Sequence, residues 1–374
     1  MLNGHGPETA LLVGIVLPRQ ARWEAEDSLA ELVQLARSAG ARVAETVLQD
    51  RDRLEPRYLI GKGKAEEIRA RCGGVDVVIM DEELSGSQQR NLEQLLGRRV
   101  VDRTGLILDI FAQRAQTREG KLQVELAQLD YLLPRLAGAW THLERLGGGI
   151  GTRGPGETQL ESDRRRIKTR MAKLRKDLEQ VRRHRALLRR PRRKVPFPIL
   201  ALVGYTNAGK SSLMNALTNA DVVVRNQLFA TLDPTLRRLV LPHDRVALLS
   251  DTVGFIRKIP HQLVAAFQAT LEEIQEASLL LHVVDASHPH AQLQQEAVEA
   301  VLGELGLADR PTILVWNKID RLGQSPFPWR PGSGRVAISA KTGAGLDDLR
   351  HEVVACLDRA AIPSAVSTME ALGR

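Results

Sequence analysis

Eight residues, Gly204 to Ser211, constrain the fold of this chain more than any other stretch. They read G-Y-T-N-A-G-K-S and stand between an apolar run at residues 199–203 and a helical pattern at residues 212–217. The two glycines permit backbone angles that other residues resist, so successive N–H groups can face phosphate oxygens. Lys210 adds a charge for the β- and γ-phosphates, and Ser211 offers a hydroxyl to Mg²⁺. The sequence therefore predicts a phosphate-binding loop between a buried strand and a helix.

Chain length and net charge limit the classes of protein to which this sequence can belong. A chain of 374 residues is long for one core, so we expect two or three domains. Its formal net charge of +8 favours a polyanionic partner only if the charge is concentrated. Cys72 and Cys356 lack neighbouring His or Cys at metal-ligand spacing. We expect a cytoplasmic protein without membrane insertion, because no run of about 18 apolar residues and no leader pattern occurs. We also expect a monomer.

The first part of the chain alternates strands and helices. Apolar or alternating runs predict strands at residues 11–17, 41–47, 75–80 and 100–101, and helical spacing predicts helices at residues 26–38, 65–71 and 87–96. This order is typical of a small parallel α/β domain, which we place at residues 1–103. Its G-K-G-K stretch, residues 61–64, has two interpretations: a solvated turn, or a loop that binds phosphate or RNA backbone.

Residues 104–194 have a helical period instead. Two leucine-rich stripes recur at steps of three, four or seven residues. The first comprises Leu122, Leu126, Leu129, Leu133 and Leu136; the second comprises Leu160, Ile167, Met171, Leu174, Leu178 and Val181. They predict an antiparallel helical hairpin with a kink at Pro134, although a compact bundle is the alternative. The Gly-rich loop between the arms, residues 147–159, is either a tether or a segment that orders on RNA.

The second arm of this hairpin concentrates the positive charge. Sixteen basic residues stand against three acidic ones between residues 162 and 194, so the rest of the chain is net acidic. The basic residues are Arg164, Arg165, Arg166, Lys168, Arg170, Lys173, Arg175, Lys176, Arg182, Arg183, Arg185, Arg189, Arg190, Arg192, Arg193 and Lys194. A solvated helix face is the alternative, but so one-sided a stripe favours nucleic acid. Because aromatic residues make up only 3% of the chain, structured RNA is expected rather than stacked single strands.

The last domain, residues 195–360, completes a nucleotide site around the phosphate loop. Asp251-Thr252-Val253-Gly254 follows an apolar strand, where the carboxylate can hold Mg²⁺ through water and the Gly254 N–H can reach a γ-phosphate. Asn317-Lys318-Ile319-Asp320 follows another strand, and its last carboxylate can accept from the N1–H and amino group of guanine, which adenine cannot match. Ser339-Ala340-Lys341 fits a further loop around the base. These motifs predict GTP and GDP as ligands; no role is assigned to residues 361–374.

Three further stretches join these motifs and the hairpin: Phe229-Ala230-Thr231-Leu232-Asp233-Pro234-Thr235, the G-K-G-K of residues 61–64, and G-G-G-I-G-T-R-G-P-G-E-T-Q-L-E. With them the chain is similar to the HflX family of translation-factor-class GTPases over nearly its whole length. The resemblance implies an N-terminal α/β domain with a hairpin, a Ras-like P-loop GTPase domain and binding to the large (50S) ribosomal subunit and its rRNA. It further implies splitting of stalled ribosomes, especially under heat stress, and ATP binding in the N-terminal half, although no second phosphate loop is present. By the family motif, Thr231 is the switch threonine on Mg²⁺.

The predicted contacts are therefore assigned as follows. Lys210, Thr231 and Gly254 are expected to act in catalysis, and Ser211 and Thr231 to ligate Mg²⁺. The expected nucleotide contacts are Gly204, Tyr205, Thr206, Asn207, Ala208, Gly209, Lys210, Ser211, Phe229, Ala230, Thr231, Leu232, Asp233, Asp251, Thr252, Val253, Gly254, Asn317, Lys318, Ile319, Asp320, Ser339, Ala340 and Lys341.

Two positions modify the expected chemistry. Phe255 stands where many GTPases have a glutamine that orients the attacking water, so intrinsic hydrolysis should be slow and a partner should stimulate it. Asn207 resembles the potassium-ligating asparagine of cation-activated GTPases, which predicts a K⁺ ion that supplies charge in the transition state.

We therefore expect a GTP-hydrolysing switch that acts on the 50S subunit. Two other functions stay open: an RNA-remodelling enzyme driven by hydrolysis, and a non-ribosomal regulator that uses the hairpin as a protein-interaction arm.

Overall fold

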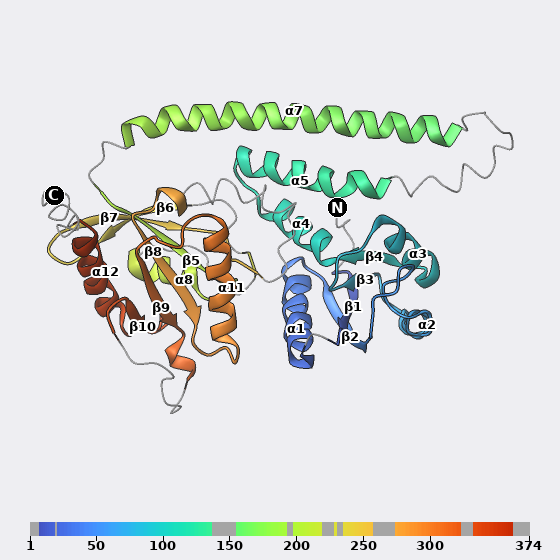
Figure 1. The fold of residues 1–374 in the computed structure, drawn as a ribbon, viewed down its shortest axis with the longest axis horizontal. Helices are drawn as coiled ribbons and strands as arrows, with labels where there is room; N and C mark the ends of the chain where they lie inside the picture. Colours follow the sequence, from blue (N-terminus) through green and yellow to red (C-terminus); the bar gives the residue numbers. More distant parts are fainter. Residues whose placement is uncertain are drawn as a thin grey trace, which may run out of the picture. The chain divides into compact units, whose positions relative to one another are not determined.

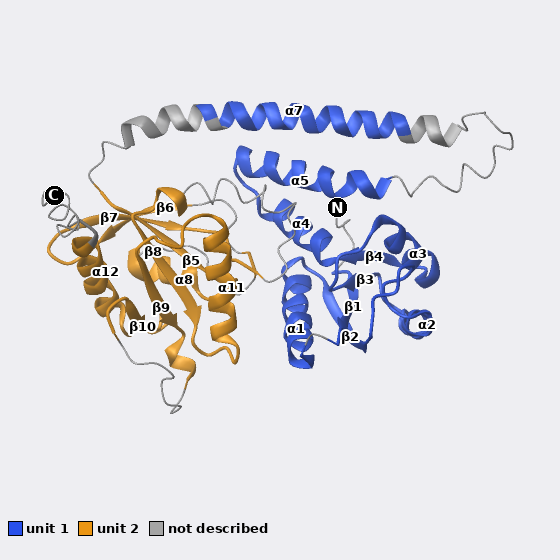
Figure 2. Cartoon of the chain, in the orientation of Figure 1, with its two compact units in different colours: residues 1–187, 259–266 blue, residues 188–258, 267–374 orange. Residues whose placement is uncertain are grey.

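A computed structural model describes residues 7–18, 21–136, 155–192, 197–218, 228–229, 235–256, 274–322 and 332–361. The chain forms two compact units (Figure 2). The first comprises residues 1–187 with 259–266, and the second comprises residues 188–258 with 267–374.

The first unit is built on a four-stranded parallel sheet (Figure 1). Its strands are β1 (Thr9–Val16), β2 (Arg42–Asp50), β3 (Val77–Met80) and β4 (Arg99–Asp102), in the order β2-β1-β3-β4. Every residue of β1 is buried, as its apolar run predicts for a central strand covered on both faces. The expected parallel α/β fold is confirmed.

Helices cover both faces of this sheet. On one face, Leu29 of α1 (Arg22–Ser38) packs against Gly14 of β1: its Cδ1 would lie 3.6 Å from a Cβ at that glycine. On the other, α2 (Lys62–Arg71) and α3 (Gly86–Leu96) pack their buried residues against the alternate side chains of β1, Leu11 and Val13. The chain thus buries both sides of each central strand.

The G-K-G-K stretch is not a loop. Gly61 is the N-cap of α2, and Lys62 to Lys64 form its first turn. Lys64 pairs with Glu67, one turn on, at 2.8 Å. The expected turn or loop conformation is therefore wrong, because Gly61 begins a helix; the expected binding of phosphate or RNA backbone by this stretch stays a prediction.

A helix that the periodicity did not predict, α4 (Arg103–Arg114), follows β4 directly. Asp102 caps it: Oδ1 accepts from the N–H of Gly105 at 2.8 Å. Its Ile107, Ile110 and Phe111 are buried, and α4 packs against α1, α5, β3 and β4. The chain therefore returns to the sheet before the hairpin begins.

The helical hairpin is present. Its arms are α5 (Arg118–Leu136) and α7 (Pro155–Arg192), which run antiparallel in Figure 1. Arg170 of α7 donates to both carboxylate oxygens of Glu125 of α5, at 2.7 and 2.9 Å. Met171, Leu174 and Leu178 of the predicted stripe are buried.

Two details of the predicted hairpin concern prolines. Pro134 lies inside α5, close to its end. Residues 155–159, expected in the Gly-rich loop, belong instead to the first turns of α7, because proline at the first helical position has the φ that a helix needs. Residues 147–154 of that loop lie outside the described part of the chain.

The second unit is built on a six-stranded sheet in the order β10-β9-β8-β5-β7-β6. The strands are β5 (Ile199–Gly204), β6 (Thr235–Val240), β7 (Val246–Asp251), β8 (Leu279–Asp285), β9 (Thr312–Asn317) and β10 (Arg335–Ala337). Only the β6–β7 pair is antiparallel among these strands. The carboxyl ends of the central parallel strands therefore share one edge, where open α/β sheets bind ligands.

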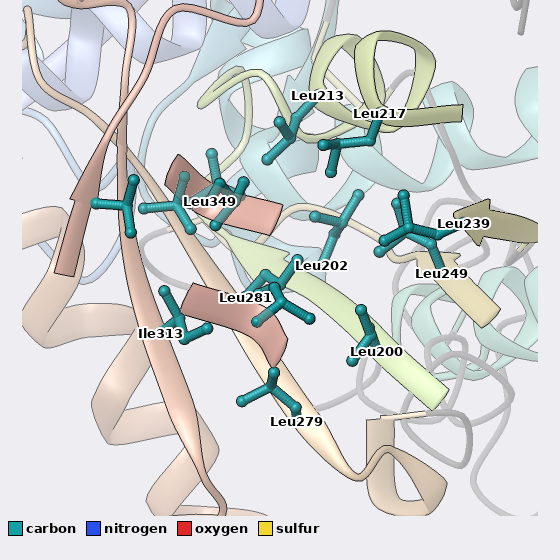
Figure 3. Close-up of a cluster of buried hydrophobic side chains, with 14 of the residues drawn as sticks. Leu200, Leu202, Leu213, Leu217, Leu239, Leu249, Leu279, Leu281, Ile313 and Leu349 are labelled. Atoms are coloured by element: carbon teal, nitrogen blue, oxygen red, sulfur yellow. The ribbon is translucent and has the colours of Figure 1, made fainter. Parts of the chain in front are cut away.

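Apolar residues from several strands and helices form one core on a face of this sheet (Figure 3). Leu202 of β5 and Leu281 of β8 belong to this core together with Leu213 of α8 (Lys210–Thr218) and Leu349 of α12 (Leu346–Ala361). The other face carries α11 (Ala291–Glu304), whose Val298 is fully buried. Helix α12 and the short helix η1 (Ile319–Arg321) were not predicted. Among the described residues, no helix is long and apolar enough to cross a membrane.

Candidate functional site: a nucleotide pocket and a basic helix

The phosphate loop leaves β5 and enters α8, as predicted. Gly204 and Gly209 have φ of +149° and +98°. A Cβ on Gly204 would lie 2.2 Å from the carbonyl oxygen of Val283, and one on Gly209 would lie 2.2 Å from Nδ2 of Asn317. Both positions therefore require glycine for the close approach of neighbouring strands.

Lys210 lies at the centre of this loop. It is 6% exposed, and its Nζ donates to the carbonyl oxygens of Gly204 at 3.0 Å and Tyr205 at 2.8 Å. Burial lowers the pKa of Lys210 to about 8, while the charge of Asp251 acts in the opposite direction. A buried ammonium in this position gains most from an incoming phosphate anion.

The groups expected on the magnesium side are also together. The hydroxyl of Ser211 donates to Oδ2 of Asp251 at 2.7 Å, and Asp251 ends strand β7. A hydroxyl and a carboxylate at this separation suit Mg²⁺, which prefers oxygen ligands and keeps several waters. Ser211 and Asp251 therefore offer oxygen atoms that fit the ion.

The segment after Asp251 is attached to the phosphate loop. The N–H of Phe255 donates to the carbonyl oxygen of Gly204 at 3.1 Å, and the N–H of Thr206 donates to that of Phe255 at 2.7 Å. A Cβ on Gly254 would lie 2.7 Å from Cα of Thr206 and 2.9 Å from Nζ of Lys210. Gly254 therefore lies directly against the lysine, where a γ-phosphate contact is expected.

The guanine-recognition motifs converge from two separate stretches of chain. Nδ2 of Asn317 donates to the carbonyl oxygen of Ala208 at 2.9 Å, and its Oδ1 accepts from the N–H of Ala340 at 3.0 Å. The hydroxyl of Ser339 donates to Oδ1 of Asp320 at 2.6 Å. One amide thus ties the phosphate loop to the loop at residues 339–341.

Asp320 is exposed and available to a base. The hydrogen bond from the Ser339 hydroxyl lowers the pKa of the Asp320 carboxyl. The ionised carboxylate accepts hydrogen bonds only, which is what the two donors of guanine require. Lys341 is exposed beside it.

Most of the predicted nucleotide contacts that the structure describes lie at the carboxyl ends of the parallel strands of the second unit. Tyr205, Ala208 and Val253 are buried in the loop and strand ends. Phe229 is buried with a φ of +54°. The predicted contacts Ala230, Thr231, Leu232 and Asp233 lie outside the described residues.

Two side chains near the site were missed by sequence reasoning. Asp285, at the carboxyl end of β8, accepts from Nζ of Lys318 at 2.6 Å, and the same ammonium donates to the carbonyl oxygen of Asn207 at 2.7 Å. The rule that ligand-side residues follow parallel strands could have found Asp285. His282 is buried within β8, and burial together with the charge of Lys210 lowers its pKa to about 4.

Helix α7 forms a second candidate site in the first unit. Its exposed cations have no ion-pair partner among the described residues, apart from Arg166, Arg170 and Arg183. The unpaired exposed cations are Arg164, Arg165, Lys168, Lys173, Arg175 and Lys176. Free cations along one helix are typical of a surface that binds phosphates.

Three family models match the chain. Residues 26–112 match "GTP-binding GTPase N-terminal", residues 114–192 match "GTP-binding GTPase Middle Region", and residues 199–318 match "50S ribosome-binding GTPase". The matched ranges cover most of both units.

Curated relatives and solved structures agree. GTPase HflX of Caldanaerobacter subterraneus subsp. tengcongensis is 52% identical over 349 residues, covering 92% of this chain and 80% of the relative. GTPase HflX of Escherichia coli K12 is 51% identical over 348 residues, covering 91% and 81%. The crystal structure of SsGBP with GDP has a TM-score of 0.55 at 26% identity, covering 95% of this chain and 100% of that one. A GTP-binding protein from Sulfolobus solfataricus, in complex with GDP, has a TM-score of 0.50 at 25% identity, covering 94% and 99%.

The phosphate loop, the guanine motifs joined by Asn317, and these relatives lead to one conclusion: the chain belongs to the HflX family and is a GTP-hydrolysing enzyme with a P-loop GTPase domain.

Proposed function

We propose that this GTPase is a molecular switch that binds the large (50S) ribosomal subunit and promotes the splitting and rescue of stalled ribosomes under stress. The observation that carries the proposal is the row of exposed, unpaired cations on α7, in a chain whose other unit is a GTPase. The description "50S ribosome-binding GTPase" of the matching family model supports the choice of partner. The proposal includes a division into an α/β domain (1–103), a hairpin (104–194), a GTPase domain (195–360) and a tail (361–374).

In this mechanism the residues of the pocket recognise GTP and report its presence. Lys210 and the loop N–H groups bind the phosphates, and Asp320 selects guanine. Ser211 and Thr231 would hold Mg²⁺, which neutralises charge on the phosphates when bound. The N–H of Gly254 binds the γ-phosphate, so GTP and GDP give the segment from Asp251 to Phe255 different partners.

Two features set the rate of hydrolysis. Phe255 is 8% exposed and apolar, so it cannot orient water, and hydrolysis by the protein alone is slow. The ribosome then stimulates turnover. Asn207, exposed and with a φ of +61°, would hold K⁺, and equal turnover in K⁺ and Na⁺ at matched ionic strength would remove this part of the proposal.

The experiment measures binding to purified 50S subunits by the protein when empty, with GDP and with a non-hydrolysable GTP analogue. Binding should be tightest with the analogue and should fall steeply with salt, because phosphate contacts release counterions. GTP turnover should rise when 50S subunits are added. Equal binding in the three nucleotide states would overturn the switch, and weak salt dependence would favour the non-ribosomal regulator.

Intact ribosomes separate the switch from the remodelling enzyme. The analogue should dissociate subunits, because the switch needs GTP occupancy and not hydrolysis. Splitting that requires hydrolysis would favour the remodelling enzyme.

A matched pair of variants tests the role of α7. Lys173→Glu with Lys176→Glu should weaken 50S binding by at least about tenfold, since two phosphate contacts are lost and repulsion is added. Arg37→Glu with Arg69→Glu changes the net charge equally, at exposed positions on α1 and α2. Similar weakening by both pairs would mean that net charge, and not the α7 surface, governs binding.

ATP binding in the N-terminal half stays a proposal. A cavity of about 460 Å³ lies at the carboxyl ends of β1 and β2 and is lined by Arg22, Arg51 and Arg53 together with Asp50 and Asp52. The arginines suit phosphates, and the edge is the one that parallel sheets use for ligands. Unchanged ATP affinity in a variant with Arg51→Ala and Arg53→Ala would exclude this cavity.

A further inference from the structure

GTP hydrolysis needs a group that holds the attacking water at the γ-phosphate, and this chain has Phe255 where that group is expected. The side chain is buried and apolar. Its backbone N–H and carbonyl are already bonded to Gly204 and Thr206. Neither the side chain nor the main chain of Phe255 is therefore available to water.

Among the described residues, two hydroxyls beside the phosphate loop are engaged, whereas that of Thr206 is not. Ser211 donates to Asp251, and Thr252 donates to the carbonyl oxygen of Leu202. The side chain of Thr206 is also buried, at 6% exposure for the residue, but its Oγ1 has no hydrogen-bond partner within the described part of the chain. A buried hydroxyl without a partner destabilises the fold, so a partner supplied by the ligand would restore this loss.

The position of Thr206 fits that interpretation. Its Cγ2 lies 2.7 Å from the point where Gly254 would carry a Cβ, and Nζ of Lys210 lies 2.9 Å from the same point. Lysine and glycine at these positions contact the β- and γ-phosphates. The Thr206 side chain is therefore next to both groups that meet the reacting end of GTP.

We propose that the hydroxyl of Thr206 is a catalytic group in GTP hydrolysis that takes over the task of the missing glutamine. It donates to an oxygen of the γ-phosphate and accepts from the attacking water. The water oxygen forms a bond to the γ-phosphorus, the bond from that phosphorus to the β,γ-bridging oxygen breaks, and the water proton passes to the phosphate that leaves. Thr206 is unchanged at the end. This inference rests on the proposed placement of the γ-phosphate beside Lys210 and Gly254.

The test uses the full-length protein without ribosomes. Single-turnover GTP hydrolysis is compared in wild type, Thr206→Val, Thr206→Ala and Thr206→Ser, together with the affinity of each for GDP and a GTP analogue. Valine keeps the shape of threonine and removes the hydroxyl, whereas serine keeps the hydroxyl and removes the methyl group. Alanine carries the test if the buried valine prevents folding.

Valine and alanine should slow hydrolysis by about 10- to 100-fold, as expected for loss of one positioned hydrogen-bonding group. Serine should stay within about threefold of wild type, and all affinities should change less than hydrolysis does. Hydrolysis at the wild-type rate in the valine variant would overturn the proposal. So would a serine variant as slow as valine, or a loss of GDP affinity as large as the loss of rate, because each would assign Thr206 to the shape of the loop. Failure of wild type to bind GDP would instead remove the nucleotide site itself.

Discussion

At the scale of single residues, the GTPase unit buries two basic side chains whose charge the surroundings disfavour. Lys210 keeps two carbonyl oxygens as partners. His282 follows Leu281 along β8 and therefore points to the opposite face of the sheet from the main core. Burial lowers the pKa of both groups, so His282 is neutral at pH 7. The protonation of Lys210 affects phosphate binding, and the protonation of His282 affects the stability of the fold. The two properties therefore depend on pH in different ranges.

Replacing His282 should make the GTPase unit less sensitive to acid. The pKa of His282 is about 4 in the folded chain against an ordinary value of 6.5, so the unfolded chain binds more protons between these values and stability falls as the pH drops. Between pH 7 and pH 5 this group alone should cost about 2 kcal/mol, and His282→Leu should remove that loss. Urea denaturation at several pH values measures it. His351→Leu, at an exposed position on α12, is the control; equal pH dependence in wild type and His282→Leu would contradict the prediction.

Replacing Asp320 should change the preferred base. In Asp320→Asn the amide can still accept from N1–H and from Ser339, but its NH₂ group faces the amino group of guanine. Affinity for GTP should fall roughly 100-fold, because one donor of the base is left unpaired. Affinity for xanthosine triphosphate, which carries an oxygen there, should rise. An unchanged ratio of the two affinities, measured by fluorescence titration, would show that Asp320 does not contact the base.

At the scale of elements, one buried carboxylate joins β4, α4 and α5. Asp102 is fully buried and accepts four hydrogen bonds. They come from the N–H of Leu84 at 3.0 Å, the N–H of Gly105 at 2.8 Å, the hydroxyl of Tyr131 at 2.7 Å and the guanidinium of Arg135 at 2.9 Å. The first arm of the hairpin is therefore attached to the sheet by polar contacts as well as by its apolar face.

Asp102→Asn should strongly destabilise the first unit. The new NH₂ group would face donors, and the guanidinium of Arg135 would lose its buried anionic partner. The expected loss is about 3–5 kcal/mol in the free energy of unfolding, measured by urea denaturation followed by circular dichroism. Asp50→Asn, which removes an exposed pair with Arg22, should cost less than about 1 kcal/mol. A small loss at Asp102 would mean that apolar packing alone holds α5.

The sequence predicts an element of the fold well when the residues that determine it lie close together in the chain. The phosphate loop and the strands beside it were predicted because glycine spacing and apolar runs are local. Helix α4 was missed because Asp102 ends a strand and caps a helix at once. His282 was hidden inside the apolar run of β8. The pairing of Lys318 with Asp285 joins residues far apart in sequence, so no spacing rule could reveal it without the order of the strands.

At the scale of the whole molecule, the chain consists of two units with separate sheets and separate cores. The expected nucleotide contacts that the structure describes all belong to the second unit, and the described basic face of α7 belongs to the first. A ligand raises the free energy of unfolding only for the part of the chain that must be folded to bind it. Ligand binding can therefore show how strongly the two units are coupled.

Calorimetry should show two unfolding transitions in the free protein. GDP at about 100 times its dissociation constant should stabilise the transition of the GTPase unit by about 2.7 kcal/mol and leave the other in place. Titration with GDP during differential scanning calorimetry measures both. A single transition that moves as a whole would show that the units unfold together.

Asn317 gives the pocket a property that neither of its loops has alone. Its amide donates to the carbonyl oxygen of Ala208 and accepts from the N–H of Ala340. The loop that contacts the base and the loop that binds the phosphates are therefore joined directly. Inorganic triphosphate should therefore bind more weakly than GTP. The loss of affinity should exceed what the missing contacts to the base contribute. For the same reason, substitutions of Asn317 should weaken the binding of the base and of the phosphates together.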